Sequence, residues 1–128
     1  MSEQCFFCNY SKKVLVDNGV FYSFYDDSPV TPGHALVIPK RHVTSLLDLQ
    51  DDELVSMRDC IRETREAIEQ EHTPDGYNYG VNEGKAAGQT QPHLHIHVIP
   101  RYKGDVPNPI GGVRNVIPDS PEPKLISD

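Results

Sequence analysis

The hydrophobic and polar residues alternate most regularly between Pro92 and Ile99, where single apolar residues separate three histidines. Successive side chains of a β-strand point to opposite faces of its sheet. The alternation therefore predicts a strand over Pro92–Ile99 with three imidazoles on one face and three aliphatic side chains on the other. Four further apolar or aromatic runs predict strands over Lys13–Asp17, Val20–Asp26, His34–Pro39 and Tyr77–Asn82. An Asn-Gly pair joins the first two of these, which is a strong hairpin signal.

A helical period predicts one long helix over Asp51–Glu71. Its apolar positions recur at steps of three and four residues, so they form a single stripe that faces the core. The stripe consists of Leu54, Met57, Ile61, Thr64 and Ile68. A shorter helical turn is predicted over His42–Leu47.

These elements predict the α+β class, with a five-stranded, largely antiparallel sheet, one long helix and one short helix. A chain of 128 residues is expected to form a single domain over residues 1–128. Proline and glycine become frequent after Arg101, so residues 104–128 are expected to form a largely irregular C-terminal extension.

Charge and composition exclude several classes of function. The formal net charge of −7 argues against binding to a nucleic-acid polymer. The first residues lack a basic segment followed by an apolar run, and no apolar stretch is long enough to span a bilayer. We therefore expect a cytoplasmic protein with no membrane partner. The odd number of cysteines argues against a disulfide scaffold, and Cys60, within the helical pattern, is expected to be a small buried hydrophobe.

The three alternating histidines have three interpretations. The first is a solvated strand face, although three histidines within five residues are unusual for one. The second is a zinc site with three histidine ligands and an open position for water. Alternate side chains of a flat strand lie roughly 6.5–7 Å apart, so the outer two histidines would share one metal only across a bulge. The third is nucleophilic catalysis, in which the middle imidazole attacks and its neighbours position an anionic substrate.

The segment before the triad is rich in glycine and small polar residues. It reads Asn82-Glu83-Gly84-Lys85-Ala86-Ala87-Gly88-Gln89-Thr90-Gln91. Such a loop between two strands is able to present backbone N–H groups and short polar side chains to a phosphate. Beside three histidines it favours a phosphate-handling site over a metal hydrolase.

Several motifs together resemble the histidine triad (HIT) superfamily, in the order in which that family carries them. The matching segments are Cys5-Phe6-Phe7-Cys8, residues 29–34 (Pro-Val-Thr-Pro-Gly-His), residues 36–42 (Leu-Val-Ile-Pro-Lys-Arg-His), Asn82-Glu83-Gly84, Gly88-Gln89-Thr90 and residues 93–99 (His-Leu-His-Ile-His-Val-Ile). The resemblance implies a nucleotide hydrolase or transferase that acts at an α-phosphate. It also implies a homodimer in which the sheet continues from one subunit into the other.

The resemblance assigns catalytic roles to residues of the triad and of the preceding loop. His95 would be the nucleophile that forms a transient nucleotidyl-histidine. His97, Gln89 and Thr90 would hold phosphate oxygens and stabilise the charge that develops during transfer. Asn82 would contact the phosphate or sugar region.

The resemblance also implies how the nucleoside is bound. Asp26 matches the ribose-binding position, where a carboxylate is able to accept from both hydroxyls. Phe6, Phe7 and Phe24 match apolar positions that line the base pocket, although each could equally be an ordinary core aromatic residue. His34 is expected near the site entrance, without an assigned role.

A structural zinc site is implied for relatives with an N-terminal Cys-x-x-Cys. Here its ligands would be Cys5, Cys8, His42 and His93. Two thiolates and two imidazoles make a normal closed tetrahedral site. The alternative for the cysteines is a pair of reduced surface thiols. No organic cofactor is expected.

The third histidine of the triad separates branches of the superfamily. Nucleotidylating transferases carry glutamine where this chain has His97, which favours a hydrolase. Gly-Gln-Thr at 88–90 and Pro-Arg-x-x-Gly-Asp at 100–105 are closer to the dinucleoside polyphosphate hydrolases. The expected substrate is a (di)nucleoside polyphosphate or nucleoside phosphoramidate with a purine base, cleaved to a nucleoside monophosphate. The alternative, motivated by the proline-rich C-terminal stretch, is a non-catalytic, nucleotide-binding regulatory dimer.

Overall fold

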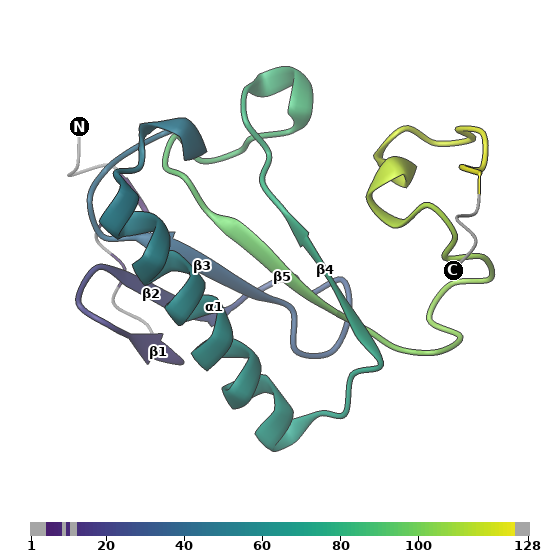
Figure 1. Cartoon of the computed structure of the whole chain (residues 1–128), viewed down its shortest axis with the longest axis horizontal. Helices are drawn as coiled ribbons and strands as arrows, with labels where there is room; N and C mark the ends of the chain where they lie inside the picture. The colour runs from purple at the N-terminus through teal and green to yellow at the C-terminus, as the bar shows by residue number, and fades with distance from the viewer. Residues whose placement is uncertain (1–4, 9, 11–12, 125–128) are drawn as a thin grey trace.

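The computed structural model describes residues 5–8, 10 and 13–124. The fold is built on one five-stranded antiparallel sheet with the strand order β1-β2-β3-β5-β4. A single long helix, α1, lies across one face of this sheet (Figure 1). The strands are β1 (Val16–Asp17), β2 (Phe21–Tyr25), β3 (Ala35–Pro39), β4 (Gly76–Gly80) and β5 (Ile96–Arg101). The helix spans Asp51–Glu71. The predicted α+β class and sheet are therefore confirmed.

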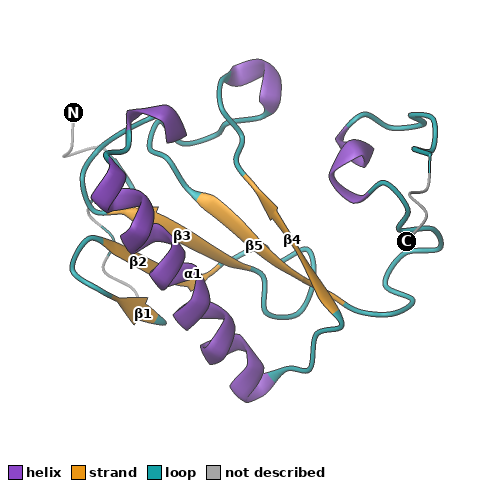
Figure 2. Ribbon diagram, viewed as in Figure 1, coloured by secondary structure: helices purple, strands orange, loops and turns teal. Residues whose placement is uncertain are grey.

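In the part of the chain that the structure describes, three short 3₁₀ helices lie in the connections between these elements and beyond them (Figure 2). They are η2 (Leu46–Asp48), η3 (Lys85–Ala87) and η4 (Gly112–Val116). The predicted short helix at His42–Leu47 was placed too early in the chain. The Val43 carbonyl accepts from Leu94 N–H, and Ser45 instead caps a later turn by accepting from the Leu47 N–H.

The strand predicted over Pro92–Ile99 begins four residues later, at Ile96. The register pairs Val37 with Ile96, which places Pro39 opposite Leu94. Proline has no N–H to donate, so the ladder between β3 and β5 ends there. The first two triad histidines therefore lie on the approach to β5 rather than within it.

The predicted alternation of faces is correct although the strand is shorter. Leu94, Ile96 and Val98 are buried in the core cluster between the sheet and α1. The three histidines project from the opposite face. A second apolar cluster covers that face, and it contains Cys5, Phe7, Tyr22, Phe24, Leu36 and Ile38. The N-terminal turn therefore packs on the side of the sheet that carries the histidines.

The bounds of α1 match the prediction, whereas its buried stripe differs from it. Leu54 is 40% exposed, and the buried residues are Glu53, Cys60, Thr64 and Ile68. The burial of Cys60 confirms its expected role. Glu53 is buried in place of Leu54, because Arg41 pairs with its carboxylate. The two hydrogen bonds run from Nε to Oε2 over 3.0 Å and from Nη2 to Oε1 over 2.8 Å.

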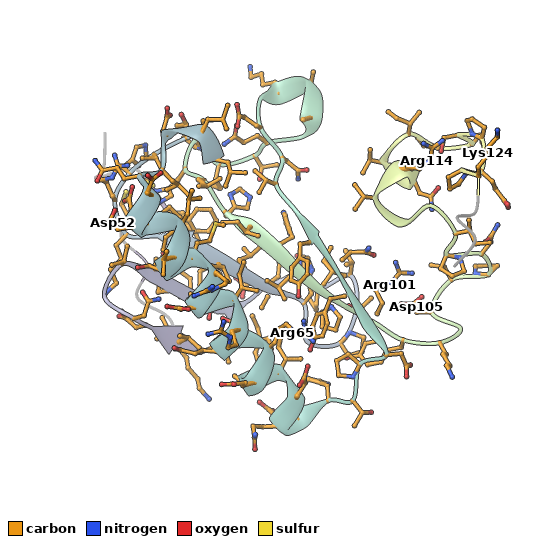
Figure 3. All side chains as sticks on the ribbon, in the orientation of Figure 1. Asp52, Arg65, Arg101, Asp105, Arg114 and Lys124 are labelled. Carbon is orange, nitrogen blue, oxygen red and sulfur yellow. The ribbon has the colours of Figure 1, made fainter. Side chains whose placement is uncertain are left out.

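An ion pair between Arg101 and Asp105 lies at the end of β5, where the C-terminal segment begins. Arg101 contacts Asp105 through two hydrogen bonds, of 2.7 and 2.8 Å, and it also donates to Asn78 of β4 (Figure 3). The chain then reaches η4, which contacts β4. Within the described part of the chain, no helix has the length and apolar character needed to cross a membrane.

The Arg41–Glu53 pair predicts a pH-dependent contribution to stability. Hydrogen bonds from Arg41 and from the Gln50 N–H lower the pKa of Glu53 from 4.5 to about 2. Since the pKa is lowered in the folded state, the contribution is full above pH 4.5 and is lost as the pH falls towards 2. Glu53→Gln should lower the free energy of unfolding by about 1–2 kcal/mol at pH 7, and by less as the pH falls below 4.5. Urea unfolding measures this, with the exposed Glu66→Gln as the unaffected control.

Candidate active site

His95 is buried, and its ring is held by a backbone carbonyl. Its Nδ1 lies 2.9 Å from the carbonyl oxygen of His93, which is only able to accept. Nδ1 therefore carries the proton, and the lone pair of the neutral ring is on Nε2. The rings of Phe7 and His97 both contact it, with centroids 5.0 and 5.3 Å from that of His95.

His97 receives its orientation from His34, which the loop between β2 and β3 brings to the same face. Asp26 N–H donates to the His34 carbonyl and closes this loop. His34 Nε2 lies 2.9 Å from His97 Nδ1 and 3.7 Å from an Asp26 carboxylate oxygen. The Val30 N–H donates to His34 Nδ1 over 3.2 Å. His34 therefore belongs to the site, in contact with His97.

These contacts fix the tautomers of both rings. Because His34 Nδ1 accepts from Val30, the neutral ring carries its proton on Nε2 and donates it to His97 Nδ1. The proton of His97 is then on Nε2, which becomes a donor for a ligand. The three side chains Asp26, His34 and His97 also lie close enough to share a metal. Binding a metal at His34 Nε2 would move its proton to Nδ1 and oppose the Val30 N–H, so the geometry favours a hydrogen-bond chain.

The rings of His34 and His97 are both neutral at physiological pH. Burial, followed by the neighbouring imidazoles of His34 and His95, lowers the pKa of His97 from 6.5 to about 4. Burial also lowers the pKa of His34, and the nearby Asp26 carboxylate opposes this shift.

The loop between β4 and β5 carries the remaining polar candidates. The side chain of Gln89 bridges the loop, since its Oε1 accepts from the Gly84 N–H over 2.8 Å and its Nε2 donates to the Gln91 carbonyl over 3.0 Å. Asn82 is half-buried and Thr90 is exposed on the same loop. The Gln89 side chain therefore holds the backbone conformation of the loop.

The three predicted aromatic residues occupy different environments. Phe6 is 43% exposed, whereas Phe7 and Phe24 are buried. Phe24 stacks on Tyr10 with the ring centroids 3.8 Å apart. Phe7 contacts Phe24 and also the imidazoles of His93 and His95.

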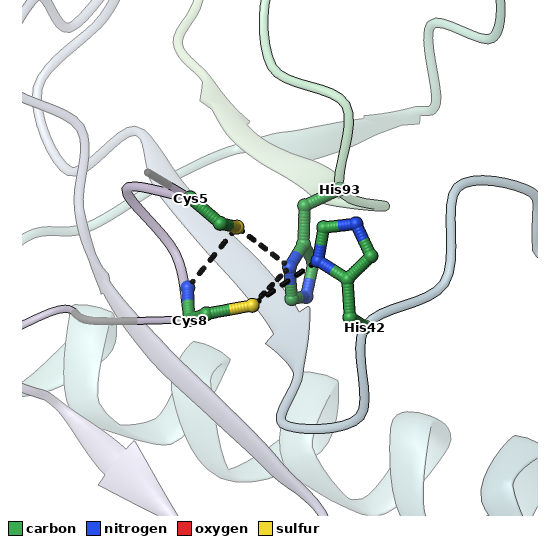
Figure 4. A group of neighbouring side chains, drawn as sticks. All are labelled: Cys5, Cys8, His42 and His93. Carbon is green, nitrogen blue, oxygen red and sulfur yellow. Dashed lines mark hydrogen bonds between the residues drawn. The ribbon is translucent and has the colours of Figure 1, made fainter. Parts of the chain in front are cut away.

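The predicted ligands Cys5, Cys8, His42 and His93 converge on one point (Figure 4). The Sγ of Cys8 lies 3.1 Å from Nδ1 of His42 and 3.4 Å from Nδ1 of His93, and the Sγ of Cys5 lies 3.2 Å from Nδ1 of His93. A tetrahedral zinc ion holds its sulfur and nitrogen ligands about 3.6 Å apart. The four side chains therefore need to move only slightly to hold such an ion.

The second nitrogen of His93 supports the same arrangement. Its Nε2 donates to the Pro39 carbonyl over 2.8 Å, so Nδ1 presents its lone pair to the cysteines. Both nitrogens of His93 are thus directed away from His95 and His97. The three triad histidines do not converge on one metal, which argues against the three-histidine zinc interpretation.

The sequence predicted His34 only near the site entrance, and it did not predict the contact with His97. The signal lay in the Thr31-Pro32-Gly33 turn before it. Gly33 has a φ of +89°, and a β-carbon there would lie 3.1–3.3 Å from side chains of His72, Ile68 and Pro100. Glycine is therefore required at this turn, immediately before His34.

Comparison with known proteins places the chain in a family. The HIT domain model matches residues 9–104. The chain is 40% identical over 102 residues to a bis(5'-nucleosyl)-tetraphosphatase (asymmetrical) of Schizosaccharomyces pombe, covering 75% of this chain and 56% of that protein. It is 41% identical over 80 residues to a bis(5'-adenosyl)-triphosphatase of Dictyostelium discoideum, covering 62% and 54%. The chain therefore belongs to the HIT family, and it spans just over half the length of these two relatives.

Solved structures agree with the family and with the fold. A zinc-bound histidine triad family protein from Mycobacterium smegmatis superposes with a TM-score of 0.72 at 34% identity, over 82% of this chain and 80% of that one.

The hydrogen bonds from Val30 to His34 and from His34 to His97 predict the protonation state of His97. Nitrogen NMR of the ring should show a neutral imidazole protonated on Nε2 at pH 7, with a titration midpoint near the pKa of about 4. His34→Ala removes the donor to Nδ1, so the spectrum should become a mixture of tautomers. A titration midpoint at the ordinary value in the wild-type protein would contradict the assignment. Lys124→Ala, on the exposed C-terminal segment, is the control.

Proposed function

We propose that this protein is a nucleotide hydrolase that cleaves at the α-phosphate of a (di)nucleoside polyphosphate or nucleoside phosphoramidate and releases a nucleoside monophosphate. One observation carries the proposal: the ring of His95, with its lone pair on Nε2, contacts the ring of His97, whose Nε2–H is free to donate. This pairing supplies a nucleophile and a donor for the charge that develops. The names of the two hydrolase relatives support a dinucleoside polyphosphate as the substrate.

The proposed reaction has two steps. Nε2 of His95 attacks the α-phosphorus, a new P–N bond forms, and the bridging bond to the leaving group breaks with its electron pair. Water then attacks the same phosphorus, the P–N bond breaks, and the nucleoside monophosphate leaves with His95 restored. The bond from Nδ1–H to the His93 carbonyl stabilises the positive charge that the ring carries in the intermediate.

The other residues hold the substrate in this scheme. The Nε2–H of His97 donates to a phosphate oxygen, and Asp26 accepts from the ribose hydroxyls. Gln89 acts by shaping the loop that faces the phosphates, where Thr90 and Asn82 supply further polar contacts. Phe6 and Phe24 are the aromatic candidates for contact with a purine base.

We further propose that the protein is a homodimer formed through β4. In the described part of the chain, β4 pairs with β5 alone, and its Tyr79 is 40% exposed. The other edge strand, β1, has only two residues. A second copy that pairs with β4 would continue the sheet and cover this edge.

His95→Ala tests the nucleophile. Turnover of diadenosine tetraphosphate should fall at least about a thousandfold, as expected when a nucleophile is removed, while the affinity for the nucleotide changes little. Chromatography measures the released nucleotides, calorimetry measures binding, and mass spectrometry of the quenched wild-type reaction should detect a nucleotidyl adduct on His95. His72→Ala, at the end of α1, is the control histidine variant.

Two outcomes would contradict the proposal. Normal turnover by His95→Ala would exclude this residue as the nucleophile. Tight binding of nucleotides by the wild-type protein, with negligible hydrolysis of polyphosphates and phosphoramidates, would instead support a non-catalytic nucleotide-binding dimer.

We propose that the cluster of Cys5, Cys8, His42 and His93 holds a structural zinc ion. When bound, the ion would supply a fixed tetrahedral link between the N-terminal turn and the approach to β5. The donor set and the zinc-bound relative from Mycobacterium smegmatis support this proposal.

Cys8→Ser tests the zinc site. The variant should lose bound zinc, measured by elemental analysis. Its melting temperature should fall by an amount equivalent to about 3–4 kcal/mol when the wild-type protein is studied at zinc concentrations 100 to 1,000 times its dissociation constant. Cys60→Ala, far from the cluster, should keep its zinc. An immediate loss of turnover on chelation, with no change in melting temperature, would indicate a catalytic metal instead.

A further inference from the structure

Among the described residues of the N-terminal turn, Phe7 connects the metal-ligand cluster with His95. It lies between Cys5 and Cys8 in the sequence and is 6% exposed. Its ring centroid lies 5.9 Å from that of His93 at an angle of 82°, and 5.0 Å from that of His95 at 53°. One side chain thus touches both a cluster ligand and the proposed nucleophile.

The hydrogen bond of His95 leaves part of its orientation undetermined. The contact from Nδ1 to the His93 carbonyl fixes the tautomer and the position of one atom. The plane of the ring, and with it the direction of Nε2, depends on what packs against the ring. Phe7 and His97 are the two aromatic neighbours of His95. His97 is held by His34, so Phe7 supplies an independent aromatic contact.

Phe7 is itself fixed from three directions. The Cys5–Cys8 turn holds its backbone, with the Cys8 N–H donating to the Cys5 sulfur over 3.3 Å. The buried Tyr22 hydroxyl donates to the Phe7 carbonyl. Phe24 also contacts its ring, with the centroids 6.0 Å apart. The ring is therefore placed by the turn that carries two of the four ligands.

We propose that Phe7 is a positioning residue for His95, through which the state of the Cys5–Cys8 turn controls the direction of the nucleophilic nitrogen. The proposal rests on the proposed role of His95. It differs from a base-pocket role for Phe7, because a residue that binds the base affects KM, whereas one that aims the nucleophile affects kcat. It also means that filling of the metal site and reactivity of His95 are coupled.

Phe7→Leu tests the proposal, because leucine keeps the site apolar and removes the flat ring. In protein with a full complement of zinc, kcat for diadenosine tetraphosphate should fall on the order of tenfold, the factor expected from the loss of one aromatic packing contact, with KM little changed. Tyr22→Phe is the milder second variant, since it frees the Phe7 carbonyl without changing the ring. Phe21→Leu, in the core on the helix side of the sheet, is the matched control.

A second measurement does not depend on turnover. Diethyl pyrocarbonate modifies neutral imidazoles, and peptide fragmentation locates the label on His95. Phe7→Leu should increase the rate of labelling of His95 in zinc-loaded protein, whereas Phe21→Leu should lower the melting temperature without this effect. Removal of zinc should increase labelling strongly in the wild-type protein and less in Phe7→Leu, because one of the two connections is already lost.

The outcomes separate this proposal from the proposed function. If wild-type protein does not hydrolyse nucleotides, the proposed function fails, and the labelling of His95 still tests the contact with Phe7. An unchanged kcat and labelling rate in Phe7→Leu would overturn the positioning role. A raised KM with an unchanged kcat would assign Phe7 to the base pocket. Equal effects of zinc removal in the wild-type protein and in Phe7→Leu would overturn the coupling.

Discussion

The hydrogen bond from His93 Nε2 to the Pro39 carbonyl is the contact on which the rest of this structure depends. It turns the His93 lone pair towards the two cysteines, and it anchors the residue whose own carbonyl orients His95. The same proline lacks an N–H, so it ends the ladder between β3 and β5 and frees the backbone around His93 for this use. The metal-ligand cluster and the candidate nucleophile thus share one support.

A backbone group selects the tautomer of three of the imidazoles that have a role here. The Pro39 carbonyl selects it for His93, the His93 carbonyl for His95, and the Val30 N–H for His34. His97 inherits its tautomer from His34. Backbone groups do not titrate, so the direction in which each ring donates or accepts is set by the fold itself.

The sequence predicted most of this arrangement, because periodicity and motif spacing are local properties. The alternation placed the triad histidines opposite Leu94, Ile96 and Val98, and the predicted bounds of α1 were correct. The contact of His34 with His97 and the burial of Glu53 against Arg41 were not predicted. Both depend on which side chains meet across the fold, and a pattern along one segment does not contain that information. The packing of Phe7 against His95 belongs to the same category.

The neutral state of His34 and His97 has a consequence for how this acidic chain would hold an anion. With the pKa values of both rings lowered, neither carries a counter-charge near neutral pH, and the chain as a whole is negative. A phosphate held by oriented N–H dipoles in a buried setting is screened little by dissolved ions, unlike one held by exposed lysines and arginines. Affinity at such a site depends on geometry, and it stays nearly constant as ionic strength rises.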